Sequence, residues 1–342
     1  MFNNWHKKEK PIQGLMGFGG GATGNLVRGG GGGGAFSGTG GTNTVDNGGY
    51  RYHFFRYGGP NTFTVDPEYG GDATGLEILV IAGGGGGGNR TGGGGGAGGI
   101  AFAHNIPNNT IPGNVAGNNI TISVGNYVQR GDASDRNGGN TIFAPGAPYE
   151  VFAAGGGSGG TDGYPAAPGG SGGGSHYNAT TGTATQPGEN VNKPWVTNYG
   201  HPGSNGYTPT PWESGGGGGA GSRGTDSPGP QRGTAGDGQL FPSFNSSIFV
   251  PSSDPWYSAL NGRGDNGCRY GGGGGGGSHP PLSPQNHPTN ASRGGGAAGG
   301  PAGGGGGGSA IHGTGGGGGG ATNSGDGGAG AYGMLVLRYP IA

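Results

Sequence analysis

The sequence predicts an all-β fold with little or no helix, in which a β-sandwich-like sheet is joined to a bundle of polyglycine II helices. Three observations lead to this class. Short apolar runs have the length and the β-branched or aromatic composition of strands. No window holds a sustained helical period, and a glycine inside a helix costs about 1 kcal/mol. Glycine supplies 102 of the 342 residues, and its blocks recur between the strand candidates.

The composition argues against two other uses of glycine. Collagen needs glycine at every third position because only glycine fits at the triple-helix axis, and blocks such as 83–88 and 271–277 lack that period. Disordered chains usually combine low hydrophobicity with high net charge. This chain has a formal net charge of -1 and 9 % aromatic residues, so we expect it to fold.

Residues 1–28 differ in composition from the rest and are interpreted as a docking arm. The arm has too little apolar surface to fold alone, so a frayed terminus is an equal alternative. It lacks the apolar core of a signal peptide, so we expect no ordinary secretion signal. Residues 29–48 are expected to be a glycine-rich linker and 49–342 the main domain. The candidate docking residues are the large apolar ones: Trp5, Ile12, Leu15, Met16 and Phe18.

The best strand candidates open the main domain. Residues 50–57 alternate aromatic and polar side chains between two faces, and residues 63–65 resume the alternation after a Gly-Gly-Pro turn. Residues 76–82 are almost continuously apolar, as expected of a strand buried on both faces.

Three more strand candidates lie further along the chain, at 120–128, 149–154 and 332–339. The last of these is the only apolar run as strong as 76–82. Because these two runs stand before and after the main series of glycine blocks, we expect them to pair and to tie the ends of the domain together.

The glycine blocks are interpreted as rods that pack side by side in a bundle. In the polyproline II geometry, at about 3.1 Å per residue, a block of this size spans roughly 15 to 22 Å and makes no internal hydrogen bonds. Glycine lacks Cβ, so neighbouring rods can approach closely enough to pair their backbone groups. The small residues Ala97, Ser158, Ala297 and Ala298 are expected to face outward. The blocks are 29–34, 83–88, 92–96, 155–160, 169–174, 215–219, 271–277, 294–300, 303–308 and 315–320.

The order of these features carries a resemblance. Gly49-Tyr-Arg-Tyr-His-Phe-Phe55 and Phe63-Thr-Val65 are followed by the apolar run and glycines of 76–88, by the block 92–99 and by the terminal Gly333-Met-Leu-Val-Leu-Arg-Tyr339. Over residues 48–339 the chain resembles the glycine-rich domain common in tailed-phage virion proteins. It is also similar to the polyglycine II region of the anaplastic lymphoma kinase ectodomain and, more loosely, to polyglycine-sandwich adhesins at phage long-tail-fibre tips.

The resemblance implies a role at the surface of a virion, in a tail fibre, spike or capsid fibre. It implies that residues 1–28 dock on other virion proteins, and that the chain forms a homo-oligomer, for which we expect a trimer. We expect no enzymatic activity, because a strand followed by further glycine lacks the helix that a dinucleotide site needs. The histidines show no paired metal-ligand spacing, so no cofactor is expected.

Other partner classes are disfavoured by charge and hydropathy. Phosphate binding needs a basic surface, which a net charge of -1 does not supply, so we expect no nucleic acid. No segment approaches the 18 or more apolar residues of a membrane span, so no membrane insertion is expected.

The long inserts 176–213 and 239–293 are the candidate receptor-binding loops, because long loops on a rigid scaffold often carry function. Their aromatic residues can stack on a host surface glycan or anchor in a protein, or they can simply cover the rods. The first alternative indicates a tail-fibre or spike adhesin. The second indicates a purely structural virion component, such as a capsid fibre or cement protein. The candidate contacts are Trp195, Tyr199, Tyr207, Trp212, Phe244, Trp256, Tyr257 and Arg263.

Overall fold

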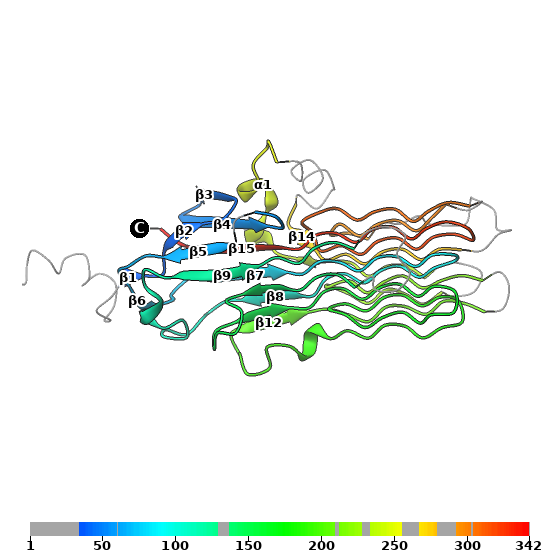
Figure 1. The fold of residues 1–342 in the computed structure, drawn as a ribbon, viewed down its shortest axis with the longest axis horizontal. Helices are drawn as coiled ribbons and strands as arrows, with labels where there is room; N and C mark the ends of the chain where they lie inside the picture. Colours follow the sequence, from blue (N-terminus) through cyan, green and yellow to red (C-terminus); the bar gives the residue numbers. More distant parts are fainter. Residues whose placement is uncertain are drawn as a thin grey trace, which may run out of the picture.

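The computed structural model describes residues 34–59, 61–128, 137–208, 212–227, 233–254, 267–278, 292–301 and 304–341. Two β-sheets occupy one end of the described chain, and extended segments run side by side from them to the other end (Figure 1). Helical structure within these residues is limited to the short α1 (Ser246–Phe249) and to the 3-10 turns η2 (Gly113–Val115), η3 (Gln186–Gly188) and η4 (Pro242–Phe244). The predicted all-β class is confirmed.

The larger sheet has six strands in the order β12-β8-β7-β15-β4-β3, and all neighbours in it are antiparallel. Strand β15 pairs with β7 from Met334 opposite Ile81 to Arg338 opposite Glu77. The expected pairing of the two strongest apolar runs is therefore confirmed. The strands are β12 (Val196–Tyr199), β8 (Ile100–Ala103), β7 (Glu77–Ile81), β15 (Met334–Pro340), β4 (Tyr50–Arg56) and β3 (Asn43–Asn47).

The second sheet has five strands in the order β11-β10-β9-β5-β2, again antiparallel. Two further pairs are small: β1 is parallel to β6, and β13 is antiparallel to β14. The strands are β11 (Val151–Ala153), β10 (Thr141–Phe143), β9 (Asn119–Ser123), β5 (Thr62–Val65), β2 (Gly38–Gly40), β1 (Gly34–Ala35), β6 (Tyr69–Asp72), β13 (Gln239–Leu240) and β14 (Arg269–Tyr270).

The prediction that residues 29–48 are a linker is wrong for residues 34–48, the part that the structure describes. Strand β2 pairs with β5 and β3 pairs with β4, so residues 38–47 extend both sheets. Phe36, between β1 and β2, is buried and stacks on Phe63 with ring centroids 5.4 Å apart. The main domain thus begins at or before residue 34, because this aromatic side chain is part of the core.

Two apolar clusters explain why residues 76–82 lack alternation. Ile78 and Val80 point into the cluster between the two sheets, which includes Phe63 and Leu335. Leu79 and Ile81 point to the other face of the larger sheet, where the segment that carries α1 covers them with residues such as Phe249. Because both faces of β7 are buried, every position of the strand is apolar except the half-buried Glu77 at its start.

The hydrogen bonds of segment 92–99 show the threefold geometry expected of a polyglycine II rod. The backbone N–H groups of Gly93, Gly96 and Gly99 donate to carbonyls of 154–160, at 2.8 Å in each case. Those of Gly94 and Ala97 donate to 214–220, and those of Gly95 and Gly98 donate to 315–320. Every third residue therefore faces the same neighbour, which is the period of this helix.

Glycine is required in this rod because its neighbours are in contact with the backbone. A Cβ built on Gly94 would lie 1.9 Å from the carbonyl oxygen of Gly274, and one on Gly95 would lie 2.2 Å from that of Gly85. Buried backbone groups are thus paired between rods rather than within them.

The expected outward orientation of the small residues holds for some of them. Ser158 and Ala298 are half-buried. Ala97 and Ala297 are buried, which corrects the prediction. Ala97 has no outward side because its rod is surrounded, and Ala297 packs with Ala310 and Ala331 in a small apolar cluster inside the bundle.

The rods set where the connecting turns lie. Segment 83–88 follows β7 and segment 92–99 leads back into β8, so the 89–91 turn between them lies at the end away from the sheets. By the same logic the 161–165 turn follows the rod that leaves β11, and the 321–326 turn precedes the rod that enters β15. We call this end the tip of the bundle (Figure 1).

Candidate functional site

The structure separates the candidate receptor contacts into groups. Phe244 is fully buried against Tyr52 and Phe102, so it belongs to the core and is not offered to a ligand. Tyr199 is half-buried in β12 and packs edge-on against Phe241. Trp195, also half-buried, packs on the cluster between the sheets. These aromatic residues cover the sheets at the end opposite to the tip.

Tyr207 and Trp212 lie in the turn that joins two rods at the tip, and both are half-buried. The backbone of Tyr207 exchanges hydrogen bonds with Glu213. The ring of Trp212 stacks on Tyr177, with centroids 4.7 Å apart and planes inclined by 12°. Outside the described residues lie the other predicted contacts Trp256, Tyr257 and Arg263 and the docking candidates Trp5, Ile12, Leu15, Met16 and Phe18.

A pocket of about 480 Å³ opens at the tip, and we call it the tip pocket. Its volume falls in the range of roughly 300 to 1,000 Å³ that is usual for small-molecule sites. The turns of several rods contribute to it, and its lining residues are Arg90, Thr91, Asp162, His176, Tyr177, Trp212, Asn323 and Ser324.

The 89–91 turn holds the other turns of the pocket together. The backbone carbonyl of Asn89 accepts a hydrogen bond from the Thr161 hydroxyl at 2.9 Å, and its side-chain oxygen accepts one from the N–H of Gly327 at 2.6 Å. The N–H of Arg90 donates to Gly325 at 3.3 Å. The Ser214 hydroxyl donates to the carbonyl of Thr91. The turns that carry Asp162, Asn323 and Trp212 are therefore fixed relative to one another.

The same turn has an unusual backbone. Arg90 and Thr91 have φ of 47° and 57°, in the left-handed region that β-branched residues such as threonine rarely adopt. Thr91 is nonetheless 3 % exposed, held by the hydrogen bond to its carbonyl. Backbone strain of this kind clusters at ligand sites, where the surrounding contacts maintain it.

His176 lines the tip pocket and is 1 % exposed. Burial lowers the pKa of the His176 imidazole, while hydrogen bonds to Asn178 and to the Arg90 backbone and the charge of Asp162 favour the protonated form. Its Nδ1 lies 3.2 Å from the side-chain oxygen of Asn178. Burial is the largest of these influences, so the ring is neutral near pH 7 and can exchange hydrogen bonds in both directions.

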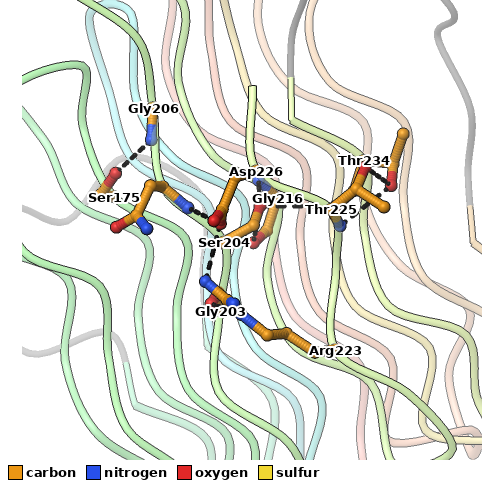
Figure 2. A network of polar contacts seen from close by, with 10 residues as sticks. Ser175, Gly203, Ser204, Gly206, Gly216, Arg223, Thr225, Asp226 and Thr234 are labelled. Carbon is orange, nitrogen blue, oxygen red and sulfur yellow. Dashed lines mark hydrogen bonds and ion pairs between the residues drawn. The ribbon is translucent and has the colours of Figure 1, made fainter. Parts of the chain in front are cut away.

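Polar side chains fasten the segments that precede and follow the turn that carries Trp212. Figure 2 shows these contacts. The N–H of Gly216 donates to the Ser204 hydroxyl at 2.8 Å. The Asp226 carboxylate accepts from the N–H of Asn205 at 2.8 Å and pairs with Arg223 at 2.7 Å. Two rods on either side of that turn are thereby tied to a third, which adds to the rigidity of the tip.

A family model described as the glycine-rich domain matches residues 59–340. The chain belongs to the glycine-rich domain family. The match spans the strands from β5 to β15 and the rods between them, including every turn that lines the tip pocket. No curated protein matches the sequence.

The part of the chain that the structure describes contains no group of three or more His, Cys, Asp or Glu residues placed to hold a metal ion. None of its helices is long and apolar enough to cross a membrane.

Sequence reasoning missed most of the tip pocket. It found Trp212 within a long aromatic insert, but Arg90, Asp162 and Asn323 stand in short turns between glycine blocks and attract no motif. One feature of the sequence could have indicated these residues. They are non-glycine residues between two glycine blocks of similar length, and such positions must lie at an end of the bundle.

Proposed function

We propose that the protein is a phage virion component, a tail-fibre or spike adhesin that contacts a host surface receptor with the tip of its rod bundle. Membership of the glycine-rich domain family and the resemblance of its strand and glycine order to tailed-phage virion proteins support this assignment. A stiff bundle is suited to the task because it holds contact residues away from the point of attachment without flexible linkers.

The observation that carries the proposal is the separation of the tip pocket from the chain ends of the domain. Gly34 is in β1, and Ile341 donates its N–H to Gly49 beside β4, so both belong to the sheet end. Attachment to other virion proteins, for which residues 1–28 are the candidate arm, then takes place opposite to the aromatic pocket. An adhesin requires this polarity, and a trimer about the bundle axis would present three tips together.

One observation favours the second candidate, a purely structural capsid fibre or cement protein. Phe244 and Tyr199, both in predicted receptor loops, serve the packing of the sheets. The aromatic content of the inserts is therefore partly explained without a receptor.

Adsorption of virions that carry variants of this protein tests the choice. Trp212→Ala at the tip should slow adsorption to host cells, whereas Tyr164→Ala should not, because Tyr164 is 65 % exposed on a tip turn outside the pocket. Imaging of the particle by cryo-electron microscopy supplies the second readout. Tips buried against neighbouring subunits, with adsorption unchanged by Trp212→Ala, would support the structural role.

A further inference from the structure

Three of the residues that line the tip pocket are aromatic rings in contact with one another. The Tyr177 ring contacts His176, at a centroid distance of 3.9 Å, and stacks on Trp212, at 4.7 Å. The three side chains come from two different turns, and Tyr177 and Trp212 are half-buried. These rings give the pocket an apolar lining of fixed orientation, because aromatic side chains have few rotatable bonds and these pack against one another.

The rim of the pocket is polar and balanced in charge. Arg90 supplies a donor-only guanidinium and Asp162 an acceptor-only carboxylate, and both are exposed. Asn323 and Ser324, also exposed, can donate and accept. A site for a phosphate or another anion gathers several positively charged hydrogen-bond donors. This rim instead has one cationic and one anionic side chain.

The combination defines a ligand class. An aromatic lining beside interspersed donors and acceptors matches a molecule with apolar C–H groups and a ring of hydroxyl groups, each of which both donates and accepts. The buried lining residues reinforce this match, since the neutral His176 ring and Thr91 add no further charge. The hydrogen bonds of the 89–91 turn hold the groups in place before any ligand arrives, so little ordering is needed on binding.

We propose that the tip pocket binds a saccharide of no net charge, with the C–H groups of the sugar against the Tyr177–Trp212 pair and its hydroxyls on Arg90, Asp162 and Asn323. The inference names the chemical class of the receptor and in that respect rests on the proposed function. A protein loop is the competing occupant, but the mixed donors and acceptors of the rim and the absence of net charge suit hydroxyl groups better.

The test uses the full-length protein and a panel of neutral sugars: glucose, galactose, mannose, N-acetylglucosamine and lactose. Saturation-transfer NMR should detect binding of at least one of them. Replacing Trp212 by alanine should weaken that binding roughly tenfold, which is the loss of one aromatic contact, whereas Trp212→Phe should retain part of it. Asp162→Asn should weaken it with no change in fold, because Asp162 is exposed.

The control variant is Tyr164→Ala, which removes an exposed aromatic ring from the 161–165 turn but leaves the pocket lining intact. Its sugar binding should equal that of the unaltered protein. Circular dichroism confirms the fold of each variant, and Asp162→Asn decides the case if Trp212→Ala does not fold. No binding across the panel, or binding that neither Trp212→Ala nor Asp162→Asn changes, overturns the saccharide site.

Virion adsorption separates this inference from the proposed function. Loss of adsorption in Trp212→Ala without sugar binding by the purified protein would leave an adhesin with a protein receptor and overturn the saccharide site. Sugar binding that Trp212→Ala abolishes, with adsorption unchanged, would establish the saccharide site and remove the adhesin role.

Discussion

His53 and Tyr339 meet on neighbouring strands of the larger sheet, where the imidazole Nε2 lies 3.0 Å from the phenol oxygen. Residue 53 of β4 stands opposite Leu337 of β15, so the two side chains are diagonal neighbours on one face. Nδ1 lies 2.8 Å from the carbonyl of Gly40 and so carries the ring proton, because a carbonyl can only accept. The Tyr339 hydroxyl also donates to the carbonyl of Gly38, at 3.0 Å. A second ring proton would place a positive charge on a side chain that is 1 % exposed, and burial disfavours that charge.

The stability of the fold should therefore decrease as the pH falls from 7 to 5. Burial lowers the pKa of His53, and it also lowers the pKa values of His176, His201 and His312. The unfolded chain, with histidine pKa values near 6.5, takes up protons that the folded chain does not. The stabilisation is present above that value and is lost as the pH falls through the folded pKa values. Denaturant unfolding at pH 8, 7, 6 and 5 measures it.

The matched variant for this prediction is His53→Phe, which keeps a ring in the core but cannot titrate. Its stability should depend less steeply on pH than that of the unaltered protein. Equal slopes for the two proteins would show that His53 does not contribute.

Gly94→Ala should destabilise the rod bundle strongly, since the new Cβ would lie 1.9 Å from the carbonyl oxygen of Gly274 and neither backbone can move alone. We expect a loss in the free energy of unfolding on the order of 3 to 5 kcal/mol, at or above the upper end of overpacking effects. The control is Gly188→Ala, where a Cβ meets nothing within 4 Å. Thermal melts of the two variants should differ clearly, and similar melting temperatures would contradict tight rod packing.

Glu77→Gln should lower the free energy of unfolding more than an equivalent change at the surface does. Glu77 pairs with Arg338 at 2.8 Å, and the Arg338 side chain is 9 % exposed and lies over the Tyr50 ring at 4.4 Å. Removing the carboxylate charge leaves this cation without its partner, at an expected cost of about 1 to 3 kcal/mol.

The comparison at the surface is Asp46→Asn, which breaks the ion pair between Asp46 and Arg51. The Arg51 side chain is 39 % exposed and the Asp46 side chain 44 %. That change should lower the free energy of unfolding less than Glu77→Gln does, because solvent screens both charges. Denaturant titration of the two variants gives the ranking. A larger effect for Asp46→Asn would refute the role assigned to Glu77.

Asn190→Ala should loosen the outer edge of the smaller sheet. The Asn190 side chain accepts from the N–H of Phe152 at 3.2 Å and donates to its carbonyl at 2.8 Å, so it occupies the free edge of β11. Its φ of 52° adds strain for alanine. Asn190→Gly removes the hydrogen bonds without that strain and should cost less, roughly 1 to 2 kcal/mol. Hydrogen exchange at Phe152 reports the opened edge in both variants.

The sequence predicted the most apolar strands and the glycine rods because both follow from local rules, but it did not predict the short strands β8, β10 and β12. The almost continuous apolar run at 76–82 indicated burial on both faces, and its pairing with 332–339 is confirmed in the register of β7 and β15. The predictions failed where burial depends on the neighbours. Phe244 has the composition of a surface loop residue but lies inside the second cluster, and Ala97 lies in a rod that other rods surround.

What the sequence determined by itself is the set of elements: strands from apolar patterning, and rods from glycine blocks whose backbone groups must find partners in other rods. Only the tertiary structure decided which rods are neighbours, because glycines offer no side chains by which one block could be distinguished from another. That arrangement brings Arg90, Asp162 and Trp212 from distant parts of the chain to one pocket. Each residue of the candidate site thus lies in a short turn that the sequence could indicate, but only the packing of the rods brings these turns together.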